Sequence, residues 1–227
     1  MTKCLLCNDT GLIFNKENNS YSQCDCSKAQ ITIEQLAATG LGSNAIKKSF
    51  KDFEPWNPKI KDMKDTATNY FLSFDRIKDQ TNNSIALLGD SGVGKTHLLV
   101  ALINNFVTKK NIKVVYMSYI DAITELKQNV LNGDVYQNRI RKYKNVEMLV
   151  IDDLFKNGHT ESDLRIMSEI INHRYINNLP TMFSSEYLIK PLVSIDKAIG
   201  GRIKEMSQNY LYEITGVENN YRMKGGN

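Results

Sequence analysis

The sequence has no long hydrophobic run. Its longest apolar stretches, at residues 85–89 (IALLG) and 147–151 (EMLVI), are far shorter than the ~20 residues that a membrane-spanning helix needs. The first residues include Lys3 but no apolar segment typical of a signal peptide. We therefore expect a cytoplasmic protein that does not associate with membranes.

Cysteine is absent after position 26, and the three histidines are too scattered along the chain to form a metal site. In a reducing cytosol, clustered cysteines bind metal or perform redox chemistry more often than they form disulfides. Cys4 and Cys7 form a C-x2-C pair, and Cys24 and Cys26 form a tighter C-x-C pair. Four thiolates suit tetrahedral zinc, and a module of ~28 residues buries too little core to fold unaided. We predict a structural zinc site of Cys4, Cys7, Cys24 and Cys26; reduced free thiols are the alternative.

Composition narrows the class of protein only slightly. With 227 residues, 41% hydrophobic and 24% charged, the chain could form one large domain or a core with a small appendage. A net charge of +4 permits nucleic-acid binding without demonstrating it.

From residue 84 onward, short apolar runs alternate with helical patterns. This order predicts an α/β fold, in which a parallel sheet is covered by helices on both faces. The expected strands are residues 84–88, 113–117, 147–151, 181–184 and 210–215, and the expected helices are 59–78, 96–107, 121–130, 135–143, 161–178 and a segment near 195–206. A small hairpin around residues 12–14 and a short helix at 29–39 precede them.

The segment GDSGVGKT fits the G-x-x-x-x-G-K-[ST] pattern of a phosphate-binding loop. Its glycines let successive N–H groups point at an anion, while Lys95 can reach the β- and γ-phosphates and Thr96 can bind Mg²⁺. A strand before the loop and a helix after it supply the required context. A glycine-rich turn with an incidental lysine is the alternative. The expected nucleotide contacts are Gly89, Asp90, Ser91, Gly92, Val93, Gly94, Lys95, Thr96 and His97.

A second nucleotide signature, MLVIDD, spans residues 148–153. A hydrophobic strand would deliver Asp152 beside the phosphate loop to hold Mg²⁺, and Asp153 could orient or deprotonate the attacking water. The alternative is a pair of carboxylates that merely ends a strand.

Two groups of basic residues have both a functional and an ordinary interpretation. Arg202 could stabilise the γ-phosphate of a neighbouring subunit's nucleotide, or it could be a solvated helix arginine. A basic run (RIRKYK) could be a solvated face or could contact nucleic-acid phosphates, with Tyr136 or Tyr143 stacking on bases. The candidate DNA contacts are Arg139, Arg141, Lys142 and Lys144.

Taken together, these motifs resemble the DnaC/DnaI-type helicase loaders of bacteria and phages, which are AAA+ ATPases. The resemblance includes GDSGVGKTHL, VYMSYIDAITELK, MLVIDDL, EIINHRYINNLPTMFSS and GGRIKEM, and so covers nearly the whole chain. It implies an AAA+ core with a five-stranded parallel sheet. Because the sequence ends soon after Arg222, we expect no separate helical lid of the kind found in larger AAA+ proteins. The resemblance also implies that the two helices at 121–143 form the insertion that helps loaders contact single-stranded DNA, and that Arg202 acts in trans.

One position departs from the family pattern. Where the family ends a strand with Thr-Ser-Asn, this chain has Ser184-Ser185-Glu186. A carboxylate near the γ-phosphate adds repulsion unless it is protonated or paired, so slow hydrolysis is expected, with Ser185 substituting in part.

The sequence therefore predicts a zinc-binding module at 1–28, a helical linker at 29–80 and an AAA+ ATPase domain at 81–227. The expected function is that of an ATP- and Mg²⁺-dependent loader. It would bind a DnaB-type replicative helicase and single-stranded DNA, and would form an ATP-dependent homo-oligomer. Two alternatives remain: an IstB-like transposition ATPase, against which the cysteine module speaks, and a non-enzymatic or weakly hydrolysing regulator of host replication proteins.

Overall fold

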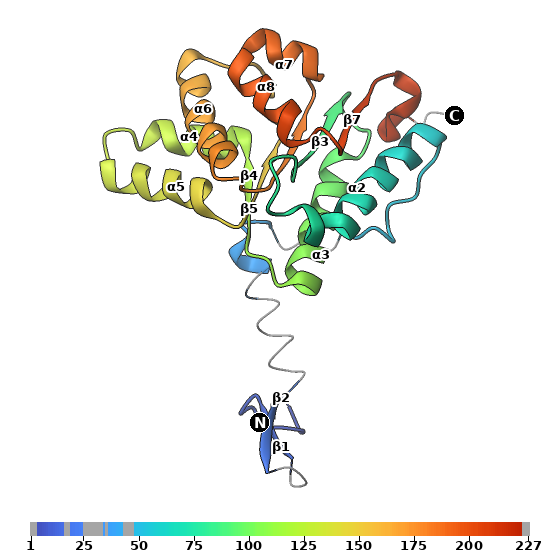
Figure 1. Ribbon diagram of the computed structural model, residues 1–227, viewed down its shortest axis with the longest axis vertical. Coiled ribbons are helices and arrows are strands. Elements are labelled where there is room, and N and C mark those ends of the chain that lie inside the picture. The colour runs from blue at the N-terminus through green and yellow to red at the C-terminus, as the bar shows by residue number, and fades with distance from the viewer. Residues whose placement is uncertain (1–3, 16–18, 25–33, 35, 43–47, 224–227) are drawn as a thin grey trace.

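A five-stranded, entirely parallel sheet forms the centre of the molecule (Figure 1). The computed structural model describes residues 4–15, 19–24, 34, 36–42 and 48–223. The strand order is β4-β5-β6-β3-β7, and the parallel pairing confirms the predicted α/β class. The strands are β3 (Ile85–Gly89), β4 (Val114–Ser118), β5 (Met148–Asp152), β6 (Thr181–Ser185) and β7 (Leu211–Ile214).

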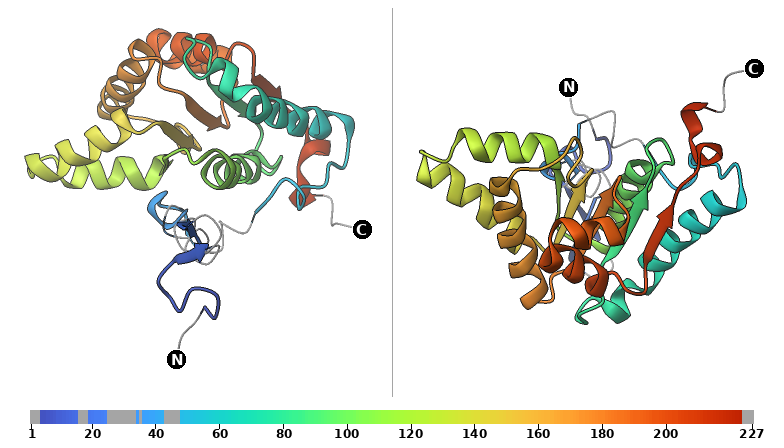
Figure 2. Two further views of the ribbon diagram at one scale, coloured as in Figure 1. Left: turned by 60° about the horizontal axis from the view of Figure 1, so that its bottom comes forward. Right: turned by 90° about the horizontal axis from the view of Figure 1, so that it is seen from above.

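Helices cover both faces of this sheet, as Figure 2 shows. One apolar cluster joins α2 and α3 to one face, and a second cluster joins α4 to α8 to the other. The helices are α2 (Pro58–Ile77), α3 (Lys95–Lys110), α4 (Tyr119–Gln128), α5 (Gly133–Asn145), α6 (Glu161–Ile176), α7 (Ile189–Ile195) and α8 (Lys197–Met206). No described helix has the length and apolar character needed to span a bilayer.

Strand β5 illustrates how the alternation of side chains divides the core. Met148 and Val150 join the cluster on the α2/α3 face, whereas Leu149 and Ile151 join the opposite cluster. Successive strand residues point to opposite faces, so the next residue of this series, Asp152, lies on the α3 face.

Several element boundaries follow from local capping. The side chain of Asn57 accepts a hydrogen bond from Ile60 N, and Pro58 occupies the first turn, where a missing N–H costs nothing. The helix predicted near 195–206 corresponds to α8, which begins at Lys197 because Asp196 has an extended backbone and its side chain accepts hydrogen bonds from Ala198 N and Ile199 N. The helix at 189–195 was not predicted. Most of the helix predicted at 29–39 lies outside the described residues.

The described residues before and after the central sheet form small elements of their own. Strands β1 (Leu12–Asn15) and β2 (Ser20–Gln23) form the predicted antiparallel hairpin. After β7, the described residues form the short helical turns η2 (Val217–Asn219) and η3 (Tyr221–Met223) rather than a helical lid. Helix α2 packs on α3 and β7, so the division of the chain at residue 80 stays a prediction.

Candidate nucleotide site

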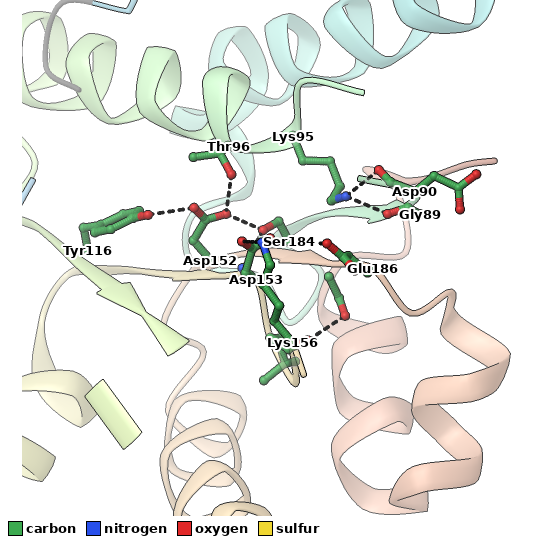
Figure 3. Close-up of polar contacts among 12 residues, drawn as sticks. Gly89, Asp90, Lys95, Thr96, Tyr116, Asp152, Asp153, Lys156, Ser184 and Glu186 are labelled. Carbon is green, nitrogen blue, oxygen red and sulfur yellow. Dashed lines mark hydrogen bonds and ion pairs between the residues drawn. The ribbon is translucent and has the colours of Figure 1, made fainter. Parts of the chain in front are cut away.

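Polar side chains from three neighbouring strands meet at the carboxyl end of the sheet. Tyr116 of β4, Asp152 of β5 and Ser184 of β6 each follow, by two residues, a side chain that packs on the α3 face: Val114, Val150 and Met182. Because side chains two apart in a strand share a face, all three point toward the start of α3. Figure 3 shows their convergence on Asp152.

The carboxylate of Asp152 is buried, only 3% exposed, and accepts hydrogen bonds from three hydroxyl groups. Thr96 Oγ1 lies 3.1 Å from Oδ1, Tyr116 OH lies 2.7 Å from Oδ2, and Ser184 Oγ also donates to Oδ1. Burial, and then the charge of Asp152, raise the pKa of the Tyr116 phenol, so it remains a donor. The structure therefore holds Asp152 in place beside Thr96, the pair predicted to bind Mg²⁺.

The phosphate loop crosses the end of β3 with its glycines in backbone conformations that other residues rarely adopt. Gly92 has φ +81° and Gly94 has φ +99°. A Cβ atom on Gly94 would lie 2.5 Å from the ring of Phe53, and one on Gly92 would lie 2.1 Å from Asn220 Oδ1. The tight loop thus needs glycine at both positions.

Lys95 is buried at the first turn of α3, and its Nζ donates to the carbonyl oxygens of Gly89 (2.6 Å) and Asp90 (2.8 Å). Burial lowers the pKa of Lys95, while the carboxylates of Asp153, Glu186 and Asp152 act in the opposite direction. The Lys95 ammonium group therefore lies within the phosphate loop, where the nearby carboxylates favour its charged form.

Next to Asp152 lies a second charged group that includes a residue not predicted from the sequence. Lys156 Nζ is 2.6 Å from Asp153 Oδ2 and 3.7 Å from Glu186 Oε1. Asp153 has φ +57°, and its N–H donates to Ser184 Oγ at 2.8 Å. Asp153, predicted to orient or deprotonate the attacking water, and Glu186, predicted to lie near the γ-phosphate, thus share one lysine (Figure 3).

A cavity of about 970 Å³ opens at the phosphate loop. The segment before α2 forms one wall: Ser49 O lies 3.0 Å from His97 Nε2, and Phe53 packs edge-on against the His97 ring at 5.2 Å. His97 therefore holds this segment over α3. The cavity is lined by Lys48, Asp52, Phe53, Glu54, Pro55, Trp56, Ser91, Gly92, Gly94, Lys95, Thr96, His97, Asp153, Lys156, Tyr221 and Arg222.

Two predicted catalytic residues lie outside this group. Ser185 is buried, and its Oγ donates to Leu154 O at 2.7 Å, so the hydroxyl that contacts Asp152 belongs to Ser184 instead. Arg202 of α8 places its guanidinium 5.7 Å from the centre of the Tyr175 ring, and it does not line the cavity.

The basic run lies on α5, which with α4 extends to one side of the sheet (Figure 1). Arg139 bonds Glu125 (Nε–Oε1 3.0 Å) and Lys144 pairs with Glu169 (3.1 Å). Arg141 and Lys142 are exposed. Of the two tyrosines proposed for base stacking, Tyr143 is buried, only 4% exposed, so it does not present a free ring.

Three of the predicted metal ligands meet in the N-terminal region. The thiols of Cys4, Cys7 and Cys24 all lie within 4.8 Å of one another, and Cys24 N donates to Gly11 O at 2.8 Å. This cluster is consistent with a zinc site. Cys26, the fourth predicted ligand, lies outside the described residues.

The residues at the loop fit a nucleoside triphosphate and Mg²⁺. The backbone cradle at Gly92 and Gly94 has no room for side chains, and a buried carboxylate lies beside Thr96. Hydroxyl and carboxylate oxygens are the ligands that Mg²⁺ prefers. Tyr116 and Ser184 could have been found from the alternation in their strands, whereas no sequence signal pointed to Lys156.

Comparison with known proteins places this geometry in a family. The IstB-like ATP binding proteins match residues 36–187. The "Uncharacterized protein YqaM" of Bacillus subtilis (strain 168) is 37% identical over 90% of this chain and 68% of its own length. The "Phage-like element PBSX protein XkdC" of the same organism is 35% identical over 98% of this chain and 86% of its own.

A solved structure supports the fold. The crystal structure of the DnaC helicase loader superposes with a TM-score of 0.65 and 24% identity, covering 76% of this chain and 99% of that one. At this identity the likeness concerns the fold alone.

Proposed function

The chain belongs to the IstB-like ATP binding proteins, AAA+ ATPases related to the DnaC and DnaI helicase loaders and to DnaA, and on this basis we propose that it is an ATP-dependent helicase loader. Its partner would be a DnaB-type replicative helicase, and it would hold single-stranded DNA. The observation that carries the proposal is the cluster around Asp152, because it joins a phosphate loop to a positioned carboxylate.

We assign the residues of the nucleotide site as follows. The loop N–H groups and Lys95 bind the phosphates, Thr96 and Asp152 hold Mg²⁺, and Asp153 orients the attacking water. When bound there, Mg²⁺ would neutralise charge on the phosphate oxygens. Arg202, which lies outside its own chain's cavity, would complete the site of a neighbouring subunit. ATP would then act as an assembly switch more than as a source of rapid turnover.

We further propose that the cysteine module is the helicase-docking part of the chain and holds zinc. Its support is the pair Leu5 and Leu6, between the first two cysteines, whose side chains are 86% and 76% exposed. Large exposed apolar side chains next to each other are typical of protein-binding surfaces. Replacing both with serine should abolish helicase binding and leave zinc and nucleotide binding unchanged.

The test is to mix the protein with hexameric replicative helicases, with and without ATP, and to measure the mass of the complexes. We expect a complex whose subunit number rises with ATP, and loss of this ATP dependence in Lys95→Ala. A Lys95→Ala variant that loads helicase with full ATP dependence would overturn the proposal.

Two further measurements separate the alternatives. A transposition ATPase would capture a transposase and not a helicase in a pull-down. A non-enzymatic regulator would show no DNA-stimulated ATP hydrolysis, whereas we expect such hydrolysis to be measurable and lost in Asp153→Asn. Asparagine tolerates the positive φ of this position, so that variant removes the charge without distorting the loop.

A further inference from the structure

The Lys156 ammonium is the cation of a charged group at the edge of the nucleotide cavity. It lies 2.6 Å from one carboxylate, Asp153, and 3.7 Å from another, Glu186. Lys156 and Asp153 both line the cavity, together with Lys95. These charges are close enough to Lys95 to influence its protonation, since Asp153 and Glu186 favour its charged form and Lys156 opposes it.

The loop that carries Lys156 is fixed to the sheet. Leu154 N donates to Ser184 O at 2.8 Å, and Leu154 and Phe155 are both buried. Lys156 N donates to Asp153 O at 3.0 Å, closing a turn in which Asp153 and Phe155 both have positive φ. The side chain is 34% exposed, so Lys156 is held at the cavity rather than extended into solvent.

The negative charges around the site suggest what the Lys156 ammonium group does when a nucleotide binds. A bound γ-phosphate adds negative charge to a site that already holds Asp152, Asp153 and Glu186. Like charges a few ångströms apart disfavour binding strongly where water is partly excluded. A nucleoside diphosphate lacks the γ-phosphate, so the carboxylates of the site repel it less than they repel a triphosphate.

We propose that Lys156 is a specificity-determining residue that offsets the charges of Asp153 and Glu186 and so lets the site accept a nucleoside triphosphate in preference to a diphosphate. This inference rests on the proposed nucleotide site. It assigns Glu186 a partner within the chain, so a carboxylate at this position is compatible with tight ATP binding. Lys156 and Glu186 would then act as one unit.

The experiment measures the dissociation constants of Mg²⁺-ATP and Mg²⁺-ADP by titration calorimetry in four proteins: the unmodified chain, Lys156→Met, Glu186→Gln and the double variant. We expect Lys156→Met to weaken ATP binding about tenfold and ADP binding less than twofold. Glu186→Gln added to Lys156→Met should restore part of the ATP affinity, because it removes one of the two uncompensated charges.

A matched control is Lys61→Met. Lys61 forms a similar short pair with Asp65 (2.7 Å) but does not line the nucleotide cavity, so the ratio of the two affinities should not change. Thermal melts of all variants check that they fold. If the unmodified chain binds neither nucleotide, the proposed function fails. If it binds both and the ratio is the same in Lys156→Met, or the double variant shows no recovery, this inference alone is wrong.

Discussion

At the scale of single residues, Gly89 has a structural role beside the one predicted for it in phosphate binding. It has φ +125°, and a Cβ atom there would lie 1.7 Å from Ile214 O of the paired strand β7. Backbone atoms of a central parallel sheet cannot move away as a flexible side chain can. Gly89 is therefore required for strand packing as well as for the turn.

We expect Gly89→Ala to lower the free energy of unfolding by about 2–4 kcal/mol, from the combined clash and backbone strain. Urea unfolding followed by circular dichroism measures this change. Gly133→Ala is the control: nothing lies within 4 Å of an added Cβ there, so stability should change by less than about 0.5 kcal/mol. Equal effects in the two variants would contradict the packing argument.

At the scale of elements, the first turn of α6 is held by a capping box that also contacts α4. Thr160 N donates to Asp163 Oδ2 at 2.8 Å, and Lys127 Nζ lies 2.5 Å from Asp163 Oδ1. Burial alone would raise the pKa of Asp163, but the bonds from Lys127 and Thr160 outweigh it and lower the pKa below its ordinary value of 3.8. The charged carboxylate therefore stabilises the folded state.

This pKa shift predicts a pH dependence of stability. A carboxyl group with a lowered folded-state pKa contributes its stabilisation above its unfolded-state pKa and loses it as the pH falls through the folded-state value. Asp163→Asn should cost about 1 kcal/mol at pH 6, and the difference from the unmodified chain should shrink below pH 4. Urea unfolding of both proteins at pH 6 and at pH 3.5 measures this. A difference that is the same at both pH values would show that the cap does not depend on the charge.

Helix α5 gives a prediction for the proposed DNA contacts. Arg139 and Lys144 already pair with Glu125 and Glu169, whereas Arg141 and Lys142 are exposed. We expect an Arg141→Ala/Lys142→Ala variant to bind single-stranded DNA more weakly, with the slope of log K against log salt reduced by about 1.4. Fluorescence anisotropy across a salt series measures this slope. Arg165→Ala on α6 is the control, since this arginine is exposed but lies outside the basic run of α5, and it should leave the slope unchanged.

At the scale of the whole molecule, the cysteine cluster and the AAA+ core should respond separately to loss of metal. Among the residues that the structure describes, strands β1 and β2 pair only with each other, and the two large apolar clusters contain no residue of this hairpin. We expect about one zinc per chain. A strong chelator should unfold the hairpin and leave nucleotide binding and the main thermal transition in place.

Elemental analysis and calorimetry check this expectation. Cys24→Ser should lose the metal, and Cys26→Ser should weaken its binding if this residue is the fourth ligand. Full zinc retention in Cys24→Ser would contradict the site, because its thiol lies among the other two.

Much of this architecture could be predicted from short-range patterns. The alternation in β5 predicts that Asp152 points toward α3, and the phosphate-loop pattern predicts the turn that precedes that helix. The charge pairs could not be predicted in the same way. Lys156 reaches Asp153 and Glu186 from a turn after β5 in which residues other than glycine have positive φ, a conformation that no local sequence pattern predicts. The partners of Arg139 and Lys144 come from α4 and α6, and their contacts depend on how these helices pack.

The contact between Thr39 and β4 has a consequence for the solubility of shortened chains. Strand β4 is an edge of the sheet, and its Tyr116 N–H donates to Thr39 O at 2.7 Å. Thr39 is itself buried, so this segment covers part of a row of backbone groups on which a strand of another molecule could pair. Removing residues 1–42 would expose that edge, and a core prepared in this way should aggregate at concentrations at which the full chain does not.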